Sequence, residues 1–278
     1  MQLPAIRAMT PADIDPVATA LLVENWGDRR LNLGFVTRHP QARPFLAEAD
    51  GEIVGTGVAS LHGSVAWIGT VWVRTDWRRR GLGRELTRVT IDAAESAGAR
   101  TLLLVATDAG RPLYEGLGFE VQTWYHILEA PGLDGVTADP SVRAYRETDL
   151  TAIATLDAAA TGVDRARVLG DFATPQSTRV LERADGTVGG FAVRAPWGGA
   201  ATIAPRIEDA EAILHSRRVV GGAAKHVRAG LLADNEAGLA RLAAAGWIEA
   251  WRAPRLIRGD ALRWQPESIW GQFNFAMG

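Results

Sequence analysis

Four arginines surround two glycines in the stretch RRRGLGR, residues 78–84. Gly81 and Gly83 have no side chain, so an anion can approach the main chain closely at both positions. Guanidinium groups carry positive charge and forked donors that suit phosphate oxygens. The groups in this stretch belong to Arg78, Arg79, Arg80 and Arg84. Because the whole chain has a net charge of only −2, this cationic turn is a local feature, and we predict that it binds a diphosphate.

A strand and a helix are predicted to hold this turn. Residues 71–73, VWV, are apolar and β-prone, and Leu86, Val89 and Ile91 mark the apolar face of a helix over residues 82–97. The glycines therefore lie at a helix N-terminus, where main-chain N–H groups lack partners and the helix dipole is positive. A P-loop would need Gly-Lys-Ser/Thr, and a Rossmann fingerprint would need a glycine at Leu86. Neither motif fits.

Three pairs of similar segments occur in the same order along the chain. Asp13 in ADIDPVATAL corresponds to Asp149 in TDLTAIATL, 136 positions later. FLAEADGEIVG and VLERADGTVGG each contain Asp-Gly, which is typical of a hairpin turn, 135 positions apart. DAGRPLYEGLGF and EAGLARLAAAGW follow at a spacing of 128. The three ordered matches predict two copies of one fold.

Each copy is predicted to form a mixed sheet with helices packed on it. In the first copy we expect strands near residues 6–8, 45–49, 53–60, 65–73, 102–106 and 120–127, and helices near 13–26, 82–97 and 111–116. Residues 130–141 are rich in Gly, Pro and Asp and separate the copies. We predict an α/β fold (an α+β mixed sheet) with tandem domains at residues 1–130 and 140–278.

Two segments resemble signatures of the GNAT superfamily of N-acetyltransferases. VRTDWRRRGLGREL is similar to its coenzyme-binding signature, with Thr75 where proline is usual, and GRPLYEGLGFE is similar to its second signature. The resemblance covers residues 6–127 and implies a tandem GNAT protein whose second copy is degenerate. It also implies acetyl-CoA as co-substrate. The main chain of Val71 and Val73 would follow the pantetheine arm, and the turn from Arg78 to Arg84 would hold the pyrophosphate.

The resemblance further implies transfer of an acetyl group to an amine. The chain has no cysteine, so a cysteinyl-acyl intermediate is excluded and we expect direct transfer. Tyr114, in the second signature, is implied as the general acid for the leaving sulfur, because a phenol with a pKa of about 10 keeps its proton at neutral pH. For the general base we predict Glu24, with His62 and Asp108 as alternatives.

The second copy has the wrong residues for a diphosphate. When the repeat is carried forward, residues 78–83 correspond to EDAEAI, residues 208–213, which contains three carboxylates and no glycine. Like charge would repel a diphosphate there. Tyr114 corresponds to Leu242. We therefore predict that the second copy kept the fold and lost the coenzyme.

Composition limits the function further. The net charge of −2 argues against nucleic-acid binding, no apolar run approaches the roughly 18 residues of a membrane helix, and the first residues lack the features of a signal peptide. The absence of cysteine removes thiolate metal sites, and we expect no metal. We predict a cytoplasmic N-acetyltransferase for a small-molecule amine, with a homodimer left open. The alternatives are an acetyltransferase of protein N-termini or lysines, and a non-catalytic acyl-CoA-binding module.

Overall fold

The computed structural model describes residues 3–278, which divide into two compact units. Unit 1 contains the chain up to Glu120 together with Leu256–Ala261 and Phe275–Met277, and unit 2 contains Val121–Arg255, Leu262–Asn274 and Gly278. The predicted domains, 1–130 and 140–278, follow the sequence repeat, whereas these units follow packing. The two divisions differ because segments from late in the chain complete unit 1.

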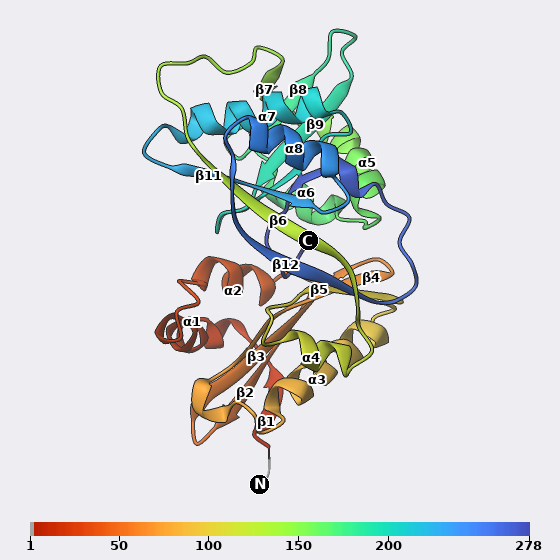
Figure 1. Cartoon of the computed structure of the whole chain (residues 1–278). Coiled ribbons are helices and arrows are strands. Elements are labelled where there is room, and N and C mark those ends of the chain that lie inside the picture. Colours follow the sequence, from red (N-terminus) through yellow and green to blue (C-terminus); the bar gives the residue numbers. More distant parts are fainter. Residues whose placement is uncertain (1–2) are drawn as a thin grey trace. The chain divides into compact units, whose positions relative to one another are not determined.

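Unit 1 is built on a mixed sheet (Figure 1). Its strands are ordered as they occur along the chain: β1 (Ala5–Ala8), β2 (Ala42–Ala49), β3 (Glu52–His62), β4 (Val65–Val73) and β5 (Thr101–Val105). Neighbours are antiparallel except β4 and β5, which are parallel. The predicted Asp-Gly hairpin is confirmed between β2 and β3, where Asp50 and Gly51 have φ of 51° and 79°.

Helices cover both sides of these strands. Figure 1 shows α1 (Ile14–Val23) and α2 (Arg30–Val36) on one side and α3 (Leu82–Ser96) on the other, with the short α4 (Arg111–Glu115) after β5. The helix α3 packs close to β3 because β3 has glycines beneath it. A Cβ on Gly55 would lie 2.6 Å from Leu86 Cδ1, and one on Gly57 would lie 2.7 Å from Thr90 Oγ1. This close packing fixes the N-terminus of α3 at the end of β4.

Unit 2 repeats the same order of elements. A second sheet has the strand order β13-β10-β9-β8-β7. The elements are β6 (Glu120–Pro131), β7 (Val142–Ala144), α5 (Leu150–Thr161), α6 (Ala166–Phe172), β8 (Thr178–Glu182), β9 (Val188–Arg194), β10 (Ala200–Ile203), α7 (Ile207–Gly221), β11 (His226–Leu232), α8 (Glu236–Ala244), β12 (Ile248–Gly259) and β13 (Ile269–Gly271).

A polar network occurs once in each unit at equivalent positions. In unit 1, Arg7 Nη2 lies 2.8 Å from Asp13 Oδ1 and 3.1 Å from Glu48 Oε2. In unit 2, Arg143 pairs with Asp149 at 2.8 Å and with Glu182 at 2.5 Å. The hydrogen bonds from these arginines are the first cause that holds the pKa of Asp13 and of Asp149 below the ordinary range. This network of equivalent side chains in both units supports the prediction of two copies of one fold.

The last strand of each copy is next to a strand of the other copy. β6 is antiparallel to β11 within unit 2, and β12 neighbours β5. In unit 1, Thr101 Oγ1 donates to Asp260 O at 2.9 Å, and a Cβ on Gly259 would lie 2.0 Å from Arg100 O. The strand predicted near residues 120–127 is present as β6, and the strand antiparallel to it, β11, comes from the second copy. Strand propensity is local, whereas the choice of partner strand depends on packing.

Candidate functional site

Strand β4 separates from β5 halfway along its length. Only Val65, Ala66 and Trp67 pair with β5, so the main chain from Ile68 onward has left that neighbour. A register shift against β3 follows, and Thr70 has φ of 51°. Thr56 Oγ1 donates to Thr70 O at 2.7 Å and holds the bulge in place. Val71 and Val73 lie in the separated part, where an extended ligand could pair with the main chain as a strand would.

The RRRGLGR turn follows β4 and ends at the first residue of α3. Gly81 is the N-cap of α3 with φ of 88°, a conformation that favours glycine. A Cβ there would meet no atom within 4 Å, so the space beside Gly81 is open. A Cβ on Gly83 would lie 3.4 Å from Leu113 Cδ1, which is ordinary contact. Gly81 is thus required by its backbone, and the free N–H groups of α3 begin beside it.

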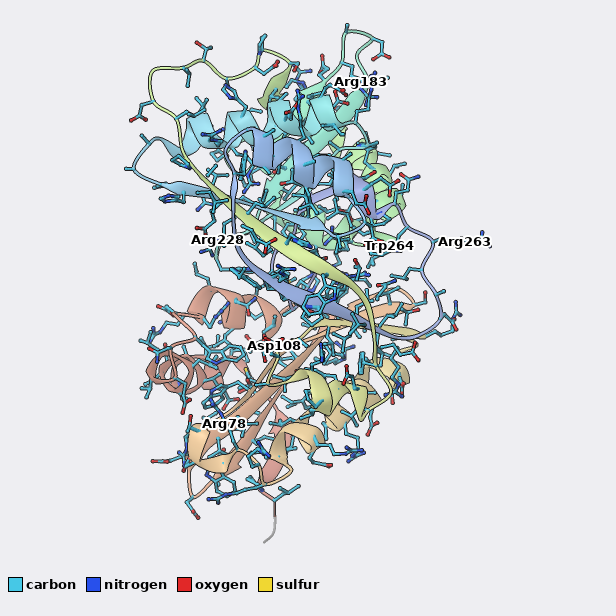
Figure 2. The ribbon with its side chains drawn as sticks, in the orientation of Figure 1. Arg78, Asp108, Arg183, Arg228, Arg263 and Trp264 are labelled. Atoms are coloured by element: carbon cyan, nitrogen blue, oxygen red, sulfur yellow. The ribbon has the colours of Figure 1, made fainter. Side chains whose placement is uncertain are left out.

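The arginines of this turn have different local contacts. Arg78 Nε donates to Val73 O at 3.0 Å, and Arg84 Nη2 donates to Gly116 O at 3.2 Å. The Arg80 guanidinium lies over the Trp77 ring, 5.2 Å from its centroid. All four side chains of the predicted set belong to exposed residues, and Figure 2 labels Arg78 on unit 1. An anion at the N-terminus of α3 would therefore meet several cations.

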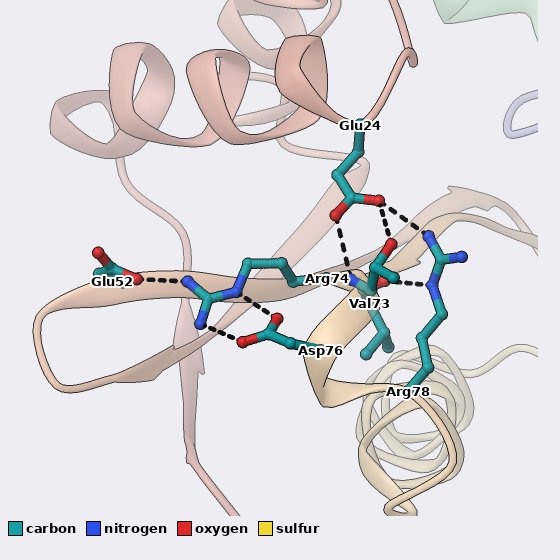
Figure 3. A network of polar contacts seen from close by, with 7 residues as sticks. Glu24, Glu52, Val73, Arg74, Asp76 and Arg78 are labelled. Carbon is teal, nitrogen blue, oxygen red and sulfur yellow. Dashed lines mark hydrogen bonds and ion pairs between the residues drawn. The ribbon is translucent and has the colours of Figure 1, made fainter.

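Glu24, predicted as the general base, contacts this turn directly (Figure 3). Its Oε1 accepts from Thr75 N at 3.1 Å, and its Oε2 accepts from the Thr75 hydroxyl at 2.7 Å and from Arg78 Nη2 at 3.0 Å. The Thr75 hydroxyl is the main cause that keeps the pKa of Glu24 below its ordinary range. Threonine supplies two donors here, and proline, usual at this position, has no N–H. The contacts favour a role in holding the turn, and the base role stays a prediction.

Tyr114 lies on α4 next to the separated strand. Its ring and Val71 both pack against one apolar cluster that contains Ile68 and Leu104. The ring also meets Phe119 edge-on at 6.1 Å. Burial raises the pKa of Tyr114 to about 12. Within residues 3–278, no hydrogen-bond partner is found for its hydroxyl, so that O–H remains available.

The two alternative bases, His62 and Asp108, also belong to unit 1. His62 is 1% exposed and pairs with Val65 at the beginning of β4. Six residues of strand separate Val65 from Val71, which is roughly 20 Å. Asp108 is exposed in the turn after β5 and is labelled in Figure 2.

The bulge at Thr70 was not predicted from the sequence, because a β-branched residue carries no signal for a positive φ.

In unit 2 a strand fills the position beside β10 that corresponds to the open side of β4. β13 is antiparallel to β10, with Thr202 opposite Gly271, and Ala204 N donates to Ser268 O at 3.0 Å. The first turn of α7 carries Glu208 and Asp209, and Asp209 pairs with Arg183, which Figure 2 labels. Leu242, in the place of Tyr114, is 2% exposed. These findings support the loss of the coenzyme site in this copy.

Two features are absent from the part of the chain that the structure describes. No group of three or more His, Cys, Asp or Glu side chains among residues 3–278 could hold a metal ion. No helix in the same range has both the length and the apolar character needed to cross a membrane.

Part of the chain is similar in sequence to known proteins. Residues 11–119 match the family described as Acetyltransferase (GNAT) family. An uncharacterized N-acetyltransferase of Bacillus subtilis, YitH, is 28% identical over 144 residues, which is 51% of this chain and 50% of that protein. The match thus spans about half the length of that relative.

Solved structures show the same fold. A putative acetyltransferase from Pyrococcus horikoshii is 21% identical with a TM-score of 0.83, covering 100% of this chain and 97% of its own. A tandem GNAT protein from the clavulanic acid biosynthesis pathway is 17% identical with a TM-score of 0.62, covering 92% and 98%. At these identities the likeness concerns fold alone. Residues 11–119 are thus similar to the GNAT family of acetyltransferases.

Proposed function

We propose that the chain transfers an acetyl group from acetyl-CoA directly to a primary amine of a small molecule. One observation carries the proposal: unit 1 combines the separated part of β4, the open N-terminus of α3 and Tyr114, which packs against the same apolar cluster as Val71 of β4. A cytoplasmic setting and a homodimeric assembly remain predictions.

The coenzyme would use the main chain and the arginines together. Its diphosphate would accept hydrogen bonds from the N–H groups at the start of α3, beside Gly81, where the helix dipole adds positive potential. The exposed arginines of the turn would supply charge-assisted hydrogen bonds. The pantetheine amides would pair with the main chain near Val71 and Val73, which no longer face β5.

The reaction forms a carbon–nitrogen bond and breaks a carbon–sulfur and a nitrogen–hydrogen bond. The neutral amine nitrogen attacks the thioester carbonyl carbon, the carbon–sulfur bond breaks, the sulfur leaves as a thiolate, and the nitrogen gives up one proton to water or to the general base, for which Glu24 is our prediction. Tyr114 would donate its O–H to that sulfur. With a pKa of about 12, it remains protonated through neutral pH. Complete transfer to a thiolate, whose acid has a pKa near 8.5, would be uphill by about 5 kcal/mol. We therefore assign Tyr114 the role of a hydrogen-bond donor that stabilises the leaving thiolate.

A thiol-release assay tests the proposal. Acetyl-CoA would be supplied with a panel of primary amines, with peptides carrying a free N-terminus and with lysine peptides. Turnover with small amines supports the proposal, turnover with peptides alone supports the protein acetyltransferase, and coenzyme binding without turnover supports the binding module. The Tyr114→Phe variant should lower kcat by roughly 10²- to 10³-fold, as loss of one aimed donor does, and leave the affinity for CoA within about twofold.

Tyr145→Phe is the matched control. Tyr145 lies in unit 2, is 8% exposed and has no place in the proposed mechanism, so kcat should stay near the wild-type value. An unchanged kcat in Tyr114→Phe would remove Tyr114 from the mechanism.

The pKa of Tyr114 also predicts a pH dependence. The rate should rise with pH as the acceptor amine loses its proton, and ionisation of Tyr114 should not lower it below about pH 11, since the pKa is about 12. Because the folded pKa is raised above the ordinary value of about 10, burial of neutral Tyr114 stabilises the fold fully below pH 10, and this contribution is lost as the pH rises to about 12. In urea titrations, the difference in free energy of unfolding between the wild type and Tyr114→Phe should change with pH only in that range.

A further inference from the structure

The two copies place an arginine at the same point between their first two helices. Arg29 precedes α2 with φ and ψ of −105° and 6°, and Arg165 precedes α6 with −106° and 14°. In unit 2, Arg165 forms a bidentate pair with Asp157, at 2.9 Å and 2.6 Å. In unit 1, the residue equivalent to Asp157 is Leu21, a core residue with no exposed surface. The first copy therefore keeps the cation and lacks its internal acid.

The two terminal nitrogens of the Arg29 guanidinium have no partner within the described residues. It is half-buried, and its Nε donates to Trp26 O at 2.8 Å. Across residues 3–278, neither of its terminal nitrogens has a hydrogen bond or an ion pair. Desolvation lowers the pKa of Arg29, and no carboxylate opposes that effect. A half-buried cation without a counter-ion destabilises a fold, so its retention calls for an explanation.

Asn32 is a second polar group without a partner beside Arg29. It is 4% exposed, and its amide has no hydrogen bond to any of the residues that the structure describes. Three positions after Arg29, it lies on the same side of α2. The equivalent residue in unit 2 is Val168, which is 1% exposed. Unit 2 thus satisfies the arginine internally and makes the second position apolar, whereas unit 1 leaves both groups unsatisfied.

The segment between α1 and α2 contacts the proposed coenzyme turn and packs against β4. Glu24, at its beginning, contacts Thr75 and Arg78 of the coenzyme turn. Trp26, in its middle, packs against the apolar cluster that contains Trp72 of β4. The side of the strands that carries α1 and α2 is opposite the side that carries α3 (Figure 1). An acceptor approaching the acyl group from that side would pass Arg29.

We infer that Arg29 and Asn32 bind a carboxylate of the acceptor, so that the acetylated molecule is an amino acid or a similar amine bearing a carboxylate. This inference rests on the proposed function. The two terminal nitrogens of Arg29 match the two oxygens of a carboxylate, and the Asn32 amide adds a donor. One cation neutralises one carboxylate, whereas a phosphate with a charge of about −1.5 to −2 would remain partly uncompensated.

The test compares matched amines that differ only in the carboxylate. The twenty common amino acids and the amines formed by their decarboxylation are assayed with the wild type, Arg29→Gln and Asn32→Val. The wild type should favour the best amino acid over its decarboxylated amine at least tenfold in kcat/KM. Arg29→Gln should reduce that ratio by about 10- to 100-fold, the effect of one charge-assisted hydrogen-bond pair, while kcat/KM for the decarboxylated amine stays within about threefold.

Arg30→Gln is the matched control. Arg30 is the adjacent residue, is exposed, and pairs with Asp15 at 2.9 Å and with Asp28 at 3.0 Å. This variant should keep the wild-type ratio. A wild type without preference for the carboxylate, or an unchanged ratio in Arg29→Gln, would overturn the inference.

A binding measurement separates this inference from the proposed function. N-acetylphenylalanine and N-acetylphenethylamine are compared for their effect on the melting temperature of the wild type and Arg29→Gln, and the comparison is repeated for the other amino acids. Stabilisation that needs both the carboxylate and Arg29 supports the inference even if no amine is acetylated, in which case only the proposed function fails. If the wild type shows neither carboxylate-dependent stabilisation nor turnover, both the carboxylate site and the proposed function are refuted.

Discussion

Replacement of Arg165 by leucine should destabilise unit 2 strongly. The side chains of Arg165 and Asp157 are 2% and 0% exposed, so this ion pair is removed from water. Burial opposes the charge of Arg165, yet the attraction and hydrogen bonds of Asp157 outweigh it and raise the pKa of Arg165. Without Arg165, Asp157 would be a buried charge with no counter-ion. Breaking such a pair from one side costs about 3–5 kcal/mol.

Thermal unfolding is the direct assay. A loss of about 3–5 kcal/mol corresponds to a fall in Tm of roughly 6–20 °C for a protein of this size range. Asp157→Leu should also lower Tm, because it leaves Arg165 buried without an acid. The double variant removes both charges, and most of the loss should be recovered, with a coupling free energy of about 2 kcal/mol or more.

Unit 1 supplies the internal comparison. In unit 1 the residue equivalent to Asp157 is Leu21, so Arg29→Leu leaves no acid behind and should change Tm by less than about 3 °C. If Arg165→Leu cost under about 1 kcal/mol, or if the two single losses simply added in the double variant, the pair would not behave as a buried ion pair. The difference between a compensated Arg165 and an uncompensated Arg29, on which the carboxylate site is argued, would then not hold.

Three further predictions concern the site and the fold. Gly81→Glu should weaken CoA binding, measured by calorimetry, at least tenfold more than Gly81→Ala, because both strain a φ of 88° and only glutamate brings a negative charge to the diphosphate. Glu24→Gln should tighten CoA binding by about two- to fivefold, since it releases Arg78 from an exposed ion pair; a fall in kcat above 100-fold would instead mark Glu24 as the base. Gly259→Ala should lower the free energy of unfolding in urea by over 2 kcal/mol, because its Cβ would lie 2.0 Å from Arg100 O. Gly98→Ala is the control: its φ is similar and the space around it is open, so it should cost about 1 kcal/mol. Equal losses would argue against the pairing of β12 with β5.

Local features of the site could be predicted from the sequence. Gly81 and the surrounding arginines follow an apolar strand and precede a periodic helix, and each of these signals depends on residues close together in the chain. The repeat likewise predicted two copies, and the carboxylates at 208–213 predicted which copy lost its anion site. Such patterns are readable because backbone preference and charge act over a few residues.

Tertiary structure decided what depends on distant partners. The pairing of β6 with β11, the pairing of β13 with β10 and the contacts of Glu24 with Thr75 join residues from 51 to 107 positions apart, and no local preference selects among them. The missing counter-ion of Arg29 is likewise a property of the fold, because equivalent positions of the two copies differ in their burial and hydrogen bonds. Both copies have an arginine at this position, but whether its charge is compensated depends on which side chain the fold brings against it.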